Sequence, residues 1–192
     1  AQPTDEISCT ITAIDGDQEF ETSVAQQMVE NTPPALSSVQ ITPNTGIYND
    51  DSASCSVTVF DADGETVTPS YIWYQGNTPI GLGSTITLDP SLISSGDTLD
   101  CVAEAIDSYG GSSTTQGSIT IENRPPVIDT HSIQGSVYTN DATLQCSATY
   151  SDPDQDNGSI HYTWFNANTG NSIGQGDSII LDSTLASPYD EI

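Results

Sequence analysis

Acidic side chains stand at alternate positions in two turn-like segments of the chain, where their oxygens could bind a metal ion. The residues are Asp61, Asp63 and Glu65 in the first segment and Asp152, Asp154 and Asp156 in the second. Carboxylates spaced in this way can direct several oxygens at one point, as calcium requires with its six to eight oxygen ligands.

Other residues could complete such a site. They are Asp107, which follows the segment 98–106, Glu122 and Asn123 before a proline pair, and Asp15 and Asp17 near the start of the chain. Asp and Gly also make good turns in the absence of metal. The residues alone therefore leave calcium binding and plain turn chemistry as two open interpretations.

Catalytic chemistry has little support. The two histidines, His131 and His161, have no counterparts in the central part of the chain, and no serine has an evident base beside it in the sequence. Carboxylates are so frequent that acid pairs carry almost no information. We expect a protein that is not an enzyme.

The elements that carry these residues repeat along the chain, at an interval of 90 to 93 residues. The matched positions are Pro33-Pro34 with Pro125-Pro126, Cys9 with Cys101, Cys55 with Cys146, and Tyr71-x-Trp73 with Tyr162-x-Trp164. Repetition at a fixed period predicts copies of one structural unit. We expect the C-terminal strands of one domain in residues 1–31, a complete domain in 32–124, and the N-terminal strands of a further domain in 125–192.

Two incomplete domains would expose core and sheet edges. Residues 1–31 of one copy could complete residues 125–192 of its neighbour, giving a head-to-tail polymer with a bond between Cys9 and Cys146. The chain could instead be a stretch of a longer continuous repeat protein, or a fragment cut without regard to domains. Residues 5–7 and 190–192 share the sequence Asp-Glu-Ile and the same repeat position, so both cannot fill one strand position.

The amino-acid composition limits the partners and the location that the protein can have. The 192 residues include 27 acidic side chains and one basic one, Arg124, for a net charge of -26. This charge argues against nucleic acid or an anionic membrane surface as a partner, and no apolar run is long enough for membrane insertion. Four cysteines at matched positions indicate a disulfide framework, and hence an extracellular or cell-surface location.

Short alternating segments between turn residues predict an all-β protein with antiparallel sheets. In 98–106, for example, Leu99, Cys101, Ala103 and Ala105 are expected to face inward. Seven strands are expected in the complete domain, at 36–42, 47–49, 53–60, 70–75, 85–89, 98–106 and 114–122.

Cys55, Trp73 and Cys101 follow one another as the Cys…Trp…Cys pattern of immunoglobulin-like domains does, and the chain resembles that family. The resemblance implies tandem immunoglobulin-like antiparallel β-sandwiches with incomplete domains at both ends. It also implies a disulfide between Cys55 and Cys101, covered by Trp73. Leu99 replaces the tyrosine often found two residues before the second cysteine. The likeness is therefore to bacterial immunoglobulin-like, PKD-like or cadherin-like repeats.

In cadherin-like repeats, Asp-x-Asp, Ala-x-Asp and Asn-x-Pro-Pro elements bind calcium at domain junctions. Asp61-Ala62-Asp63, Ala105-Ile106-Asp107 and the residues before each proline pair resemble them in part. The paired prolines also predict short, stiff linkers between domains.

These features together predict a structural subunit or repeat of an extracellular filament or surface stalk, whose partners are copies of itself or adjacent repeats. The alternative is an adhesin or carbohydrate-binding repeat of a cell-surface protein. In that case Tyr71, Tyr74, Tyr109 or Trp164 would stack on the ligand.

Overall fold

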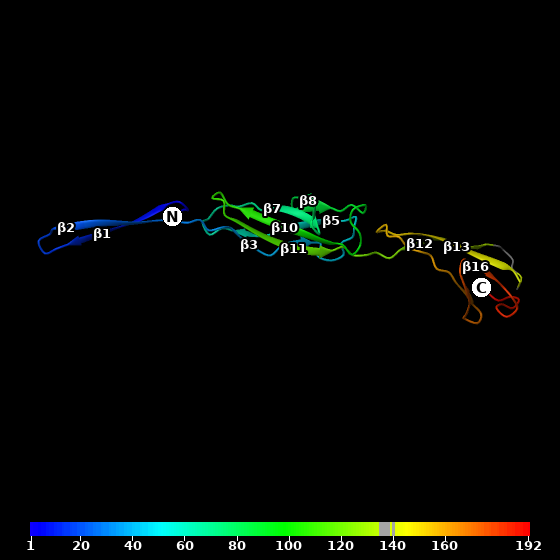
Figure 1. Ribbon diagram of the computed structural model, residues 1–192. Coiled ribbons are helices and arrows are strands. Elements are labelled where there is room, and N and C mark those ends of the chain that lie inside the picture. Colours follow the sequence, from blue (N-terminus) through cyan, green and yellow to red (C-terminus); the bar gives the residue numbers. More distant parts are fainter. Residues whose placement is uncertain (135–138, 140) are drawn as a thin grey trace. The chain divides into compact units, whose positions relative to one another are not determined.

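The computed structural model describes residues 1–134, 139 and 141–192 (Figure 1). Within these residues the protein is all-β, with its strands arranged in several sheets. It divides into two compact units, Ala1–Glu122 and Asn123–Ile192, and we call the second the C-terminal unit. The described part of the chain contains no helix with the length and apolar character needed to span a membrane.

The first two strands, β1 (Glu6–Ile14) and β2 (Phe20–Met28), form an antiparallel sheet of their own, which we call the hairpin. Their pairing runs without a bulge from Glu6 opposite Met28 to Ile14 opposite Phe20. Every residue of both strands is exposed. A two-stranded hairpin alone is at best marginally stable in water.

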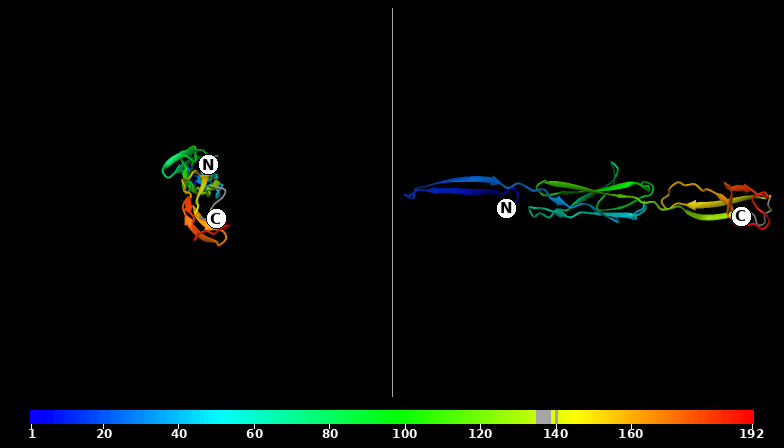
Figure 2. Two further views of the ribbon diagram at one scale, coloured as in Figure 1. Left: turned by 90° about the vertical axis from the view of Figure 1, so that its right-hand side faces the viewer. Right: turned by 90° about the horizontal axis from the view of Figure 1, so that it is seen from below.

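Residues 35–120 form a two-layered arrangement that we call the sandwich. Its strands are β3 (Ala35–Leu36), β4 (Gln40–Thr42), β5 (Ser52–Ser56), β6 (Val59–Phe60), β7 (Ser70–Gln75), β8 (Thr78–Leu82), β9 (Thr85–Thr87), β10 (Thr98–Ile106) and β11 (Ser112–Thr120). One sheet has the order β11-β10-β7-β8 and the other β4-β5-β9, while β3 pairs with β6. The right-hand view of Figure 2 shows the strands of this region as two layers.

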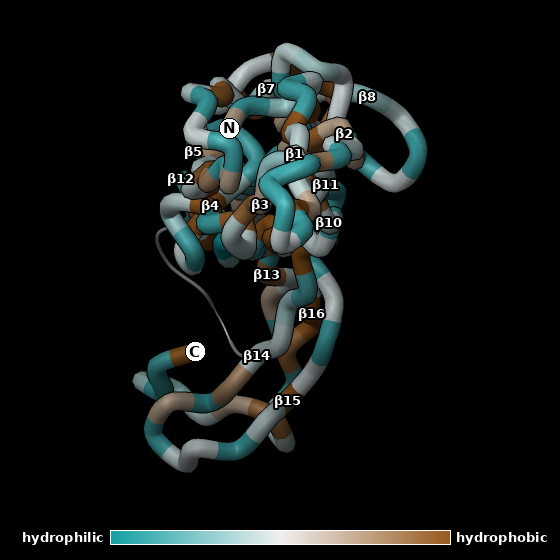
Figure 3. The backbone as a smooth tube through the Cα atoms, turned by 90° about the vertical axis from the view of Figure 1, so that its left-hand side faces the viewer, coloured by the Kyte–Doolittle hydropathy of each residue, from teal (hydrophilic) through white to brown (hydrophobic). Residues whose placement is uncertain are grey.

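Alternating side chains fill the space between the layers. Leu99, Cys101, Ala103 and Ala105 of β10 are fully buried, which confirms the inward face expected from the sequence. Figure 3 colours the backbone by hydropathy, with apolar residues in brown and hydrophilic residues in teal. The period of two follows from the pleat of a β-strand.

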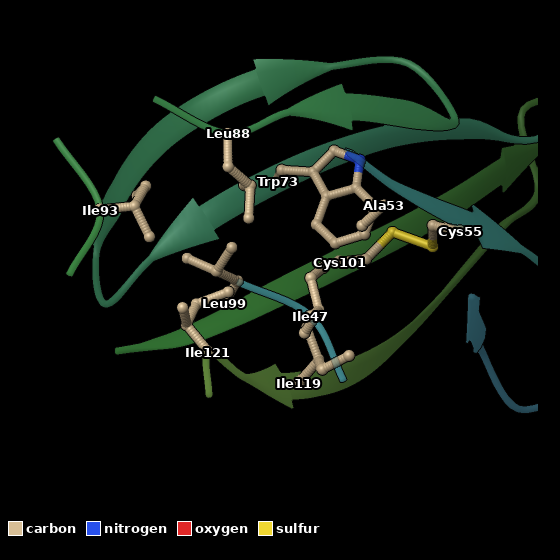
Figure 4. Packing of buried hydrophobic residues seen from close by; sticks show 10 residues of the cluster. All are labelled: Ile47, Ala53, Cys55, Trp73, Leu88, Ile93, Leu99, Cys101, Ile119 and Ile121. Carbon is tan, nitrogen blue, oxygen red and sulfur yellow. A yellow bond between two sulfur atoms is a disulfide. The ribbon is translucent and has the colours of Figure 1, made fainter. Parts of the chain in front are cut away.

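A disulfide crosses the core from β5 to β10, joining Cys55 and Cys101, whose Cα atoms are 6.5 Å apart. Trp73 of β7 is fully buried, and its indole ring lies beside this disulfide in Figure 4. The indole N–H donates a hydrogen bond to the carbonyl of Gly83 at 3.1 Å. The polar edge of the largest buried side chain is thereby satisfied.

The expected strands differ from the structure in several places. The segments 36–42 and 53–60 are each divided into two strands, and the segments 85–89 and 114–122 are observed as strands over 85–87 and 112–120. Residues 47–49 form no strand: Ile47 enters the core, but the backbone then turns, with Tyr48 N donating to Asp51 Oδ2 at 2.8 Å. Strand β8 was not expected, because Pro79 and Gly81 weaken the strand pattern. It lies at a sheet edge, where proline is tolerated.

The described residues of the C-terminal unit form five strands. They are β12 (Val127–Gln134), β13 (Thr143–Ser151), β14 (Thr163–Asn166), β15 (Asn171–Gln175) and β16 (Ser178–Ile180). They form the sheets β12-β13-β16 and β14-β15. Leu144, Trp164, Leu181 and Ala186 make its core.

The C-terminal unit repeats the first part of the sandwich. Strand β13 covers the residues that lie 91 positions after 52–60, the stretch from β5 to β6. Trp164 donates its indole N–H to the carbonyl of Gly176 at 2.9 Å, as Trp73 does to Gly83, and a bulge follows each tryptophan.

Candidate metal centre

Three carboxylates meet at one end of the sandwich. Asp61 and Glu65 belong to the turn after β6, and Asp107 follows the end of β10. One oxygen from each lies within 4.8 Å of one oxygen from each of the others. We call these residues the carboxylate cluster, and its position follows from two strand ends that reach the same edge of the fold.

The turn after β6 fixes Asp61. Its Oδ1 accepts a hydrogen bond from Asp63 N at 2.8 Å, and its backbone carbonyl accepts one from Gly64 N. The residue is only 7% exposed, and its second oxygen, Oδ2, has no hydrogen-bond partner. A buried carboxylate oxygen therefore points away from its own turn without a donor.

Backbone amides hold Asp107 in the same way. Its Oδ1 accepts from Tyr109 N at 3.0 Å and from Gly111 N at 2.7 Å, and its Oδ2 accepts from the Asn31 amide at 2.9 Å. The Asn31 hydrogen bond is the main reason that the pKa of Asp107 lies below its ordinary value. Burial raises this pKa and the backbone N–H donors lower it further. Asp107 thus stays ionised beside two other carboxylates.

Glu65 reaches the cluster from the far side of the turn. Its Oε1 accepts hydrogen bonds from the backbone N–H of Ser108, at 3.2 Å, and from the Ser108 hydroxyl. Its Oε2 is buried and has no hydrogen-bond partner. One oxygen positions the side chain and the other is left for a ligand.

Unsatisfied buried oxygens concentrate here. In the described part of the chain, the buried side-chain nitrogen and oxygen atoms without a partner are Asn31 Oδ1, Asp61 Oδ2 and Glu65 Oε2. Leaving such an atom unpaired costs about 1–3 kcal/mol. All three atoms are hard oxygen donors, and two carry charge, so the donor set fits a hard cation such as calcium.

A glycine makes room for the contact between the linker and the cluster. A Cβ atom at Gly111 would stand 2.5 Å from Asp107 Oδ2, 2.6 Å from Asn31 Nδ2 and 3.0 Å from the Cα of Pro33. Any larger residue would push the Asn31 amide away from Asp107.

Of the residues suggested by the sequence, only Asp61, Glu65 and Asp107 come together as one cluster in the part of the chain that the structure describes. Asp63 Oδ2 accepts from Thr32 N at 2.8 Å, and so binds the linker instead. Glu122 Oε1 accepts from Gly46 N at 2.6 Å.

The remaining candidates occupy separate turns. Asp15 Oδ1 accepts from the backbone N–H groups of Asp17 and Glu19, and both Asp15 and Asp17 are exposed. Asp152 Oδ1 accepts from Asp154 N at 2.8 Å and from Asp156 N at 3.4 Å.

Asp154 is buried against Arg124, whose Nη2 lies 2.7 Å from Asp154 Oδ1. Asn123, the neighbour of this arginine, is exposed. The second acidic turn therefore already has a cation from its own chain.

Sequence reasoning missed two groups, Asn31 and Ser108. Asn31 lies 92 residues before Asn123, which the sequence suggested as a metal ligand, so the repeat could have identified it. Ser108 carries no signal beyond its position next to Asp107.

The cysteines divide into a bonded pair and two free thiols. Cys55 and Cys101 form the disulfide that the family resemblance implied. Cys9 is free and exposed, and Cys146 is free and half-buried. A bond between Cys9 and Cys146 stays a prediction.

Of the four aromatic residues considered for ligand stacking, two belong to the interior. Trp164 is 5% exposed, and Tyr71 packs against the core of the sandwich. Tyr74 is half-buried, and Tyr109 is 43% exposed.

One serine stands in a Gly-x-Ser-x-Gly sequence, Ser172 between Gly170 and Gly174. It lies at the start of β15, in a hairpin with β14. The nucleophile of that motif requires a strand-to-helix turn, which this hairpin does not provide.

No known protein family, curated protein or solved structure matches this chain.

Proposed function

We propose that the chain is a structural unit of an extracellular filament or surface stalk, built from successive immunoglobulin-like sandwiches. The strand order supports this, with β11-β10-β7-β8 facing β4-β5-β9. So does the disulfide between the two sheets with a buried tryptophan beside it. This combination is typical of immunoglobulin-like domains.

The observation that carries the proposal is the repetition of structure along the chain. The hairpin has the bounds of β10 and β11 shifted by 92 residues, and its register is the same: Glu6 opposite Met28 corresponds to Thr98 opposite Thr120. These matches support the proposal that one sandwich plan recurs before, within and after residues 32–124. A chain of like domains is a mechanical element, whether it continues in one polypeptide or is joined from copies.

We also assign calcium to the carboxylate cluster. Asn31 belongs to the linker that precedes the sandwich, and it contacts Asp107 of the cluster directly. A calcium ion there would offset two of the three negative charges of the carboxylates and hold the linker to the sandwich. The disulfide and the net charge of -26 suit an oxidising, calcium-containing exterior.

Single-molecule stretching tests the mechanical role. The disulfide closes a loop with a sequence separation of 46, which cannot extend until the bond is reduced. Reduction should therefore lengthen the unfolded sandwich by about 160 Å at roughly 3.5 Å per residue. Calcium should raise the force at which the sandwich unfolds. A sandwich that extends without a discrete force step, oxidised and reduced alike, would overturn the structural role.

A further inference from the structure

Two linkers of the chain share the pattern Asn-x-Pro-Pro. The first linker is residues 31–34 and the second linker is residues 123–126. In each, the backbone N–H of the second residue donates a hydrogen bond to an acidic turn of the domain that follows. Thr32 N donates to Asp63 Oδ2 at 2.8 Å, and Arg124 N donates to Asp154 Oδ2. The same backbone contact therefore attaches each linker to its domain.

Each acidic turn buries one aspartate, but not the same one. Asp61, the first aspartate of its turn, is 7% exposed, whereas Asp154, the second aspartate of the other turn, is 3% exposed. The turns themselves are alike, because Asp61 Oδ1 and Asp152 Oδ1 each accept a hydrogen bond from the N–H two residues later at 2.8 Å. A buried carboxylate is costly unless it is paired with a cation. Both turns therefore require a cation.

The second linker supplies this cation itself. Arg124 Nε donates to Asp154 Oδ1 at 2.8 Å, and Arg124 Nη2 lies 2.7 Å from the same oxygen and 3.1 Å from the carbonyl oxygen of Pro153. The arginine side chain is 26% exposed and the aspartate side chain is fully buried. Because a guanidinium keeps its proton in proteins, this cation is present whatever the composition of the medium.

The first linker has Thr32 where the second has Arg124, so it brings no charge. It contacts the carboxylate cluster through Asn31, whose amide nitrogen donates to Asp107 Oδ2 at 2.9 Å. The amide oxygen of Asn31 is buried and has no hydrogen-bond partner, as is true of Asp61 Oδ2 and Glu65 Oε2. One amide can donate through its nitrogen and bind a cation through its oxygen. A cation taken from solution there can also be lost again.

We propose that the two linkers are fixed by different cations, so that a fall in calcium concentration loosens the first linker from the sandwich and leaves the second linker fixed. This inference rests on the proposed function and names the regulation of its calcium site. Without calcium, the cluster holds three carboxylates whose oxygens lie within 4.8 Å of one another, and their repulsion favours opening of the turn. Arg124 holds the second linker at every calcium concentration.

Amide hydrogen exchange of the 192-residue polypeptide, followed by NMR, tests this difference. The N–H groups of Thr32 and Arg124 are matched reporters, because each donates to the second aspartate of an acidic turn. Calcium at ten times its dissociation constant should slow exchange at Thr32 by roughly tenfold, since opening requires loss of the ion. Exchange at Arg124 should be the same in calcium and in chelator of matched ionic strength. Equal calcium responses at the two sites, or none at Thr32, would overturn the inference.

A substitution in the first linker tests the role of the arginine. Thr32→Arg places a guanidinium at the position that corresponds to Arg124, and Thr32 is exposed, so the longer side chain has room. After correction for intrinsic exchange rates, residue 32 of this variant should exchange slowly in chelator and should lose most of the roughly tenfold calcium response. Thr32→Gln is the control, because it adds length without charge, and it should keep the response. If the two variants responded alike, the exchange of cations would be refuted.

Thermal melts of the same samples separate this inference from the proposed function. If calcium raised the melting temperature of the sandwich while exchange at Thr32 stayed unchanged, the calcium assignment would stand and the inference about the linkers would fail. If calcium changed neither, both would fail. The lengthening of the stretched sandwich on reduction depends on the disulfide alone, so it tests the mechanical role independently of either result.

Discussion

Asp61→Asn should change the stability of the sandwich in opposite directions with and without calcium. The asparagine oxygen can still accept from Asp63 N, so the turn is kept. The change removes one negative charge and converts the unpartnered Oδ2 into an amide NH₂ group. The variant removes a calcium ligand and keeps the local fold. It therefore distinguishes the effect of calcium binding on stability from the effect of the turn.

Without calcium the variant should be the more stable protein. Oxygens of the three carboxylates lie within 4.8 Å, where two unit charges repel by about 3.5 kcal/mol at an effective dielectric constant of roughly 20. Asp61 faces two such charges. Glu65 is only half-buried and salt screens part of this repulsion, so we expect a gain of about 1–3 kcal/mol in chelator.

With calcium the wild type should gain more stability than the variant, and the order should reverse if the variant's gain in chelator is below about 2.7 kcal/mol. Extracellular calcium modules bind with dissociation constants of about 0.1–1 mM, and a ligand at a hundred times its dissociation constant stabilises the folded state by about 2.7 kcal/mol. For a domain of this size that raises the melting temperature of the wild type by roughly 10–20 °C. Asp61→Asn should show little of this increase.

Thermal melts in chelator, in calcium and in sodium chloride of matched ionic strength measure these shifts. Glu104→Gln is the control, because it removes one charge from an exposed position on β10 outside the cluster. It should keep the full calcium response. If Asp61→Asn lost stability equally in chelator and calcium, or if Glu104→Gln lost the response as well, the metal assignment would be refuted.

Three further perturbations test other parts of the structure. Replacing Cys55 and Cys101 by serine should lower the free energy of unfolding by about 4 kcal/mol in urea titrations, because the 46-residue loop loses its cross-link; an unchanged midpoint would contradict this. Arg124→Met leaves the buried Asp154 carboxylate without its guanidinium and should destabilise the C-terminal unit by about 3–5 kcal/mol. Adding Asp154→Asn should restore most of that loss, and a double variant as unstable as the single one would count against the pair. Because the pKa of Asp107 is lowered in the folded state, its ionised carboxylate stabilises the fold. This stabilisation is fully present above pH 3.8, the ordinary pKa of aspartate, and is lost as the pH falls through the lower pKa of the folded protein. Melts of the wild type and Asp107→Asn should therefore converge at the acidic end, and parallel curves would exclude this role.

Much of the fold could be predicted because the sequence alternates where one face of a strand is buried. The segment 98–106 was predicted with its observed bounds and its observed inward face. The interval between Cys9 and Cys101 reappears in the structure as two hairpins with the same register. Alternation and repetition are local or translational properties, and both can be read from a linear sequence.

The remaining features depend on contacts between distant residues. Ile47 is apolar and fully buried, yet its backbone enters a turn, because burial alone does not distinguish a strand from a core-facing loop. Asn31 contacts Asp107 across 76 residues, and its Asn-x-Pro-Pro sequence suggests a role in metal binding without indicating which residue it contacts. The cluster itself could be suspected from Asp61 and Glu65, but the oxygens that lack donors could be found only from coordinates.

A comparison of the two acidic turns supports the proposal that the first one binds a cation from solution. In each, a linker N–H donates to the second aspartate: Thr32 to Asp63 and Arg124 to Asp154. The second turn gains the guanidinium of Arg124, the single Lys or Arg side chain in a sequence with 27 acids. No other lysine or arginine is available to neutralise the first turn, and its unpartnered buried oxygens remain. Because such charge is costly to bury unpaired, a dissolved hard cation is the simplest group that satisfies both the charge and the oxygens.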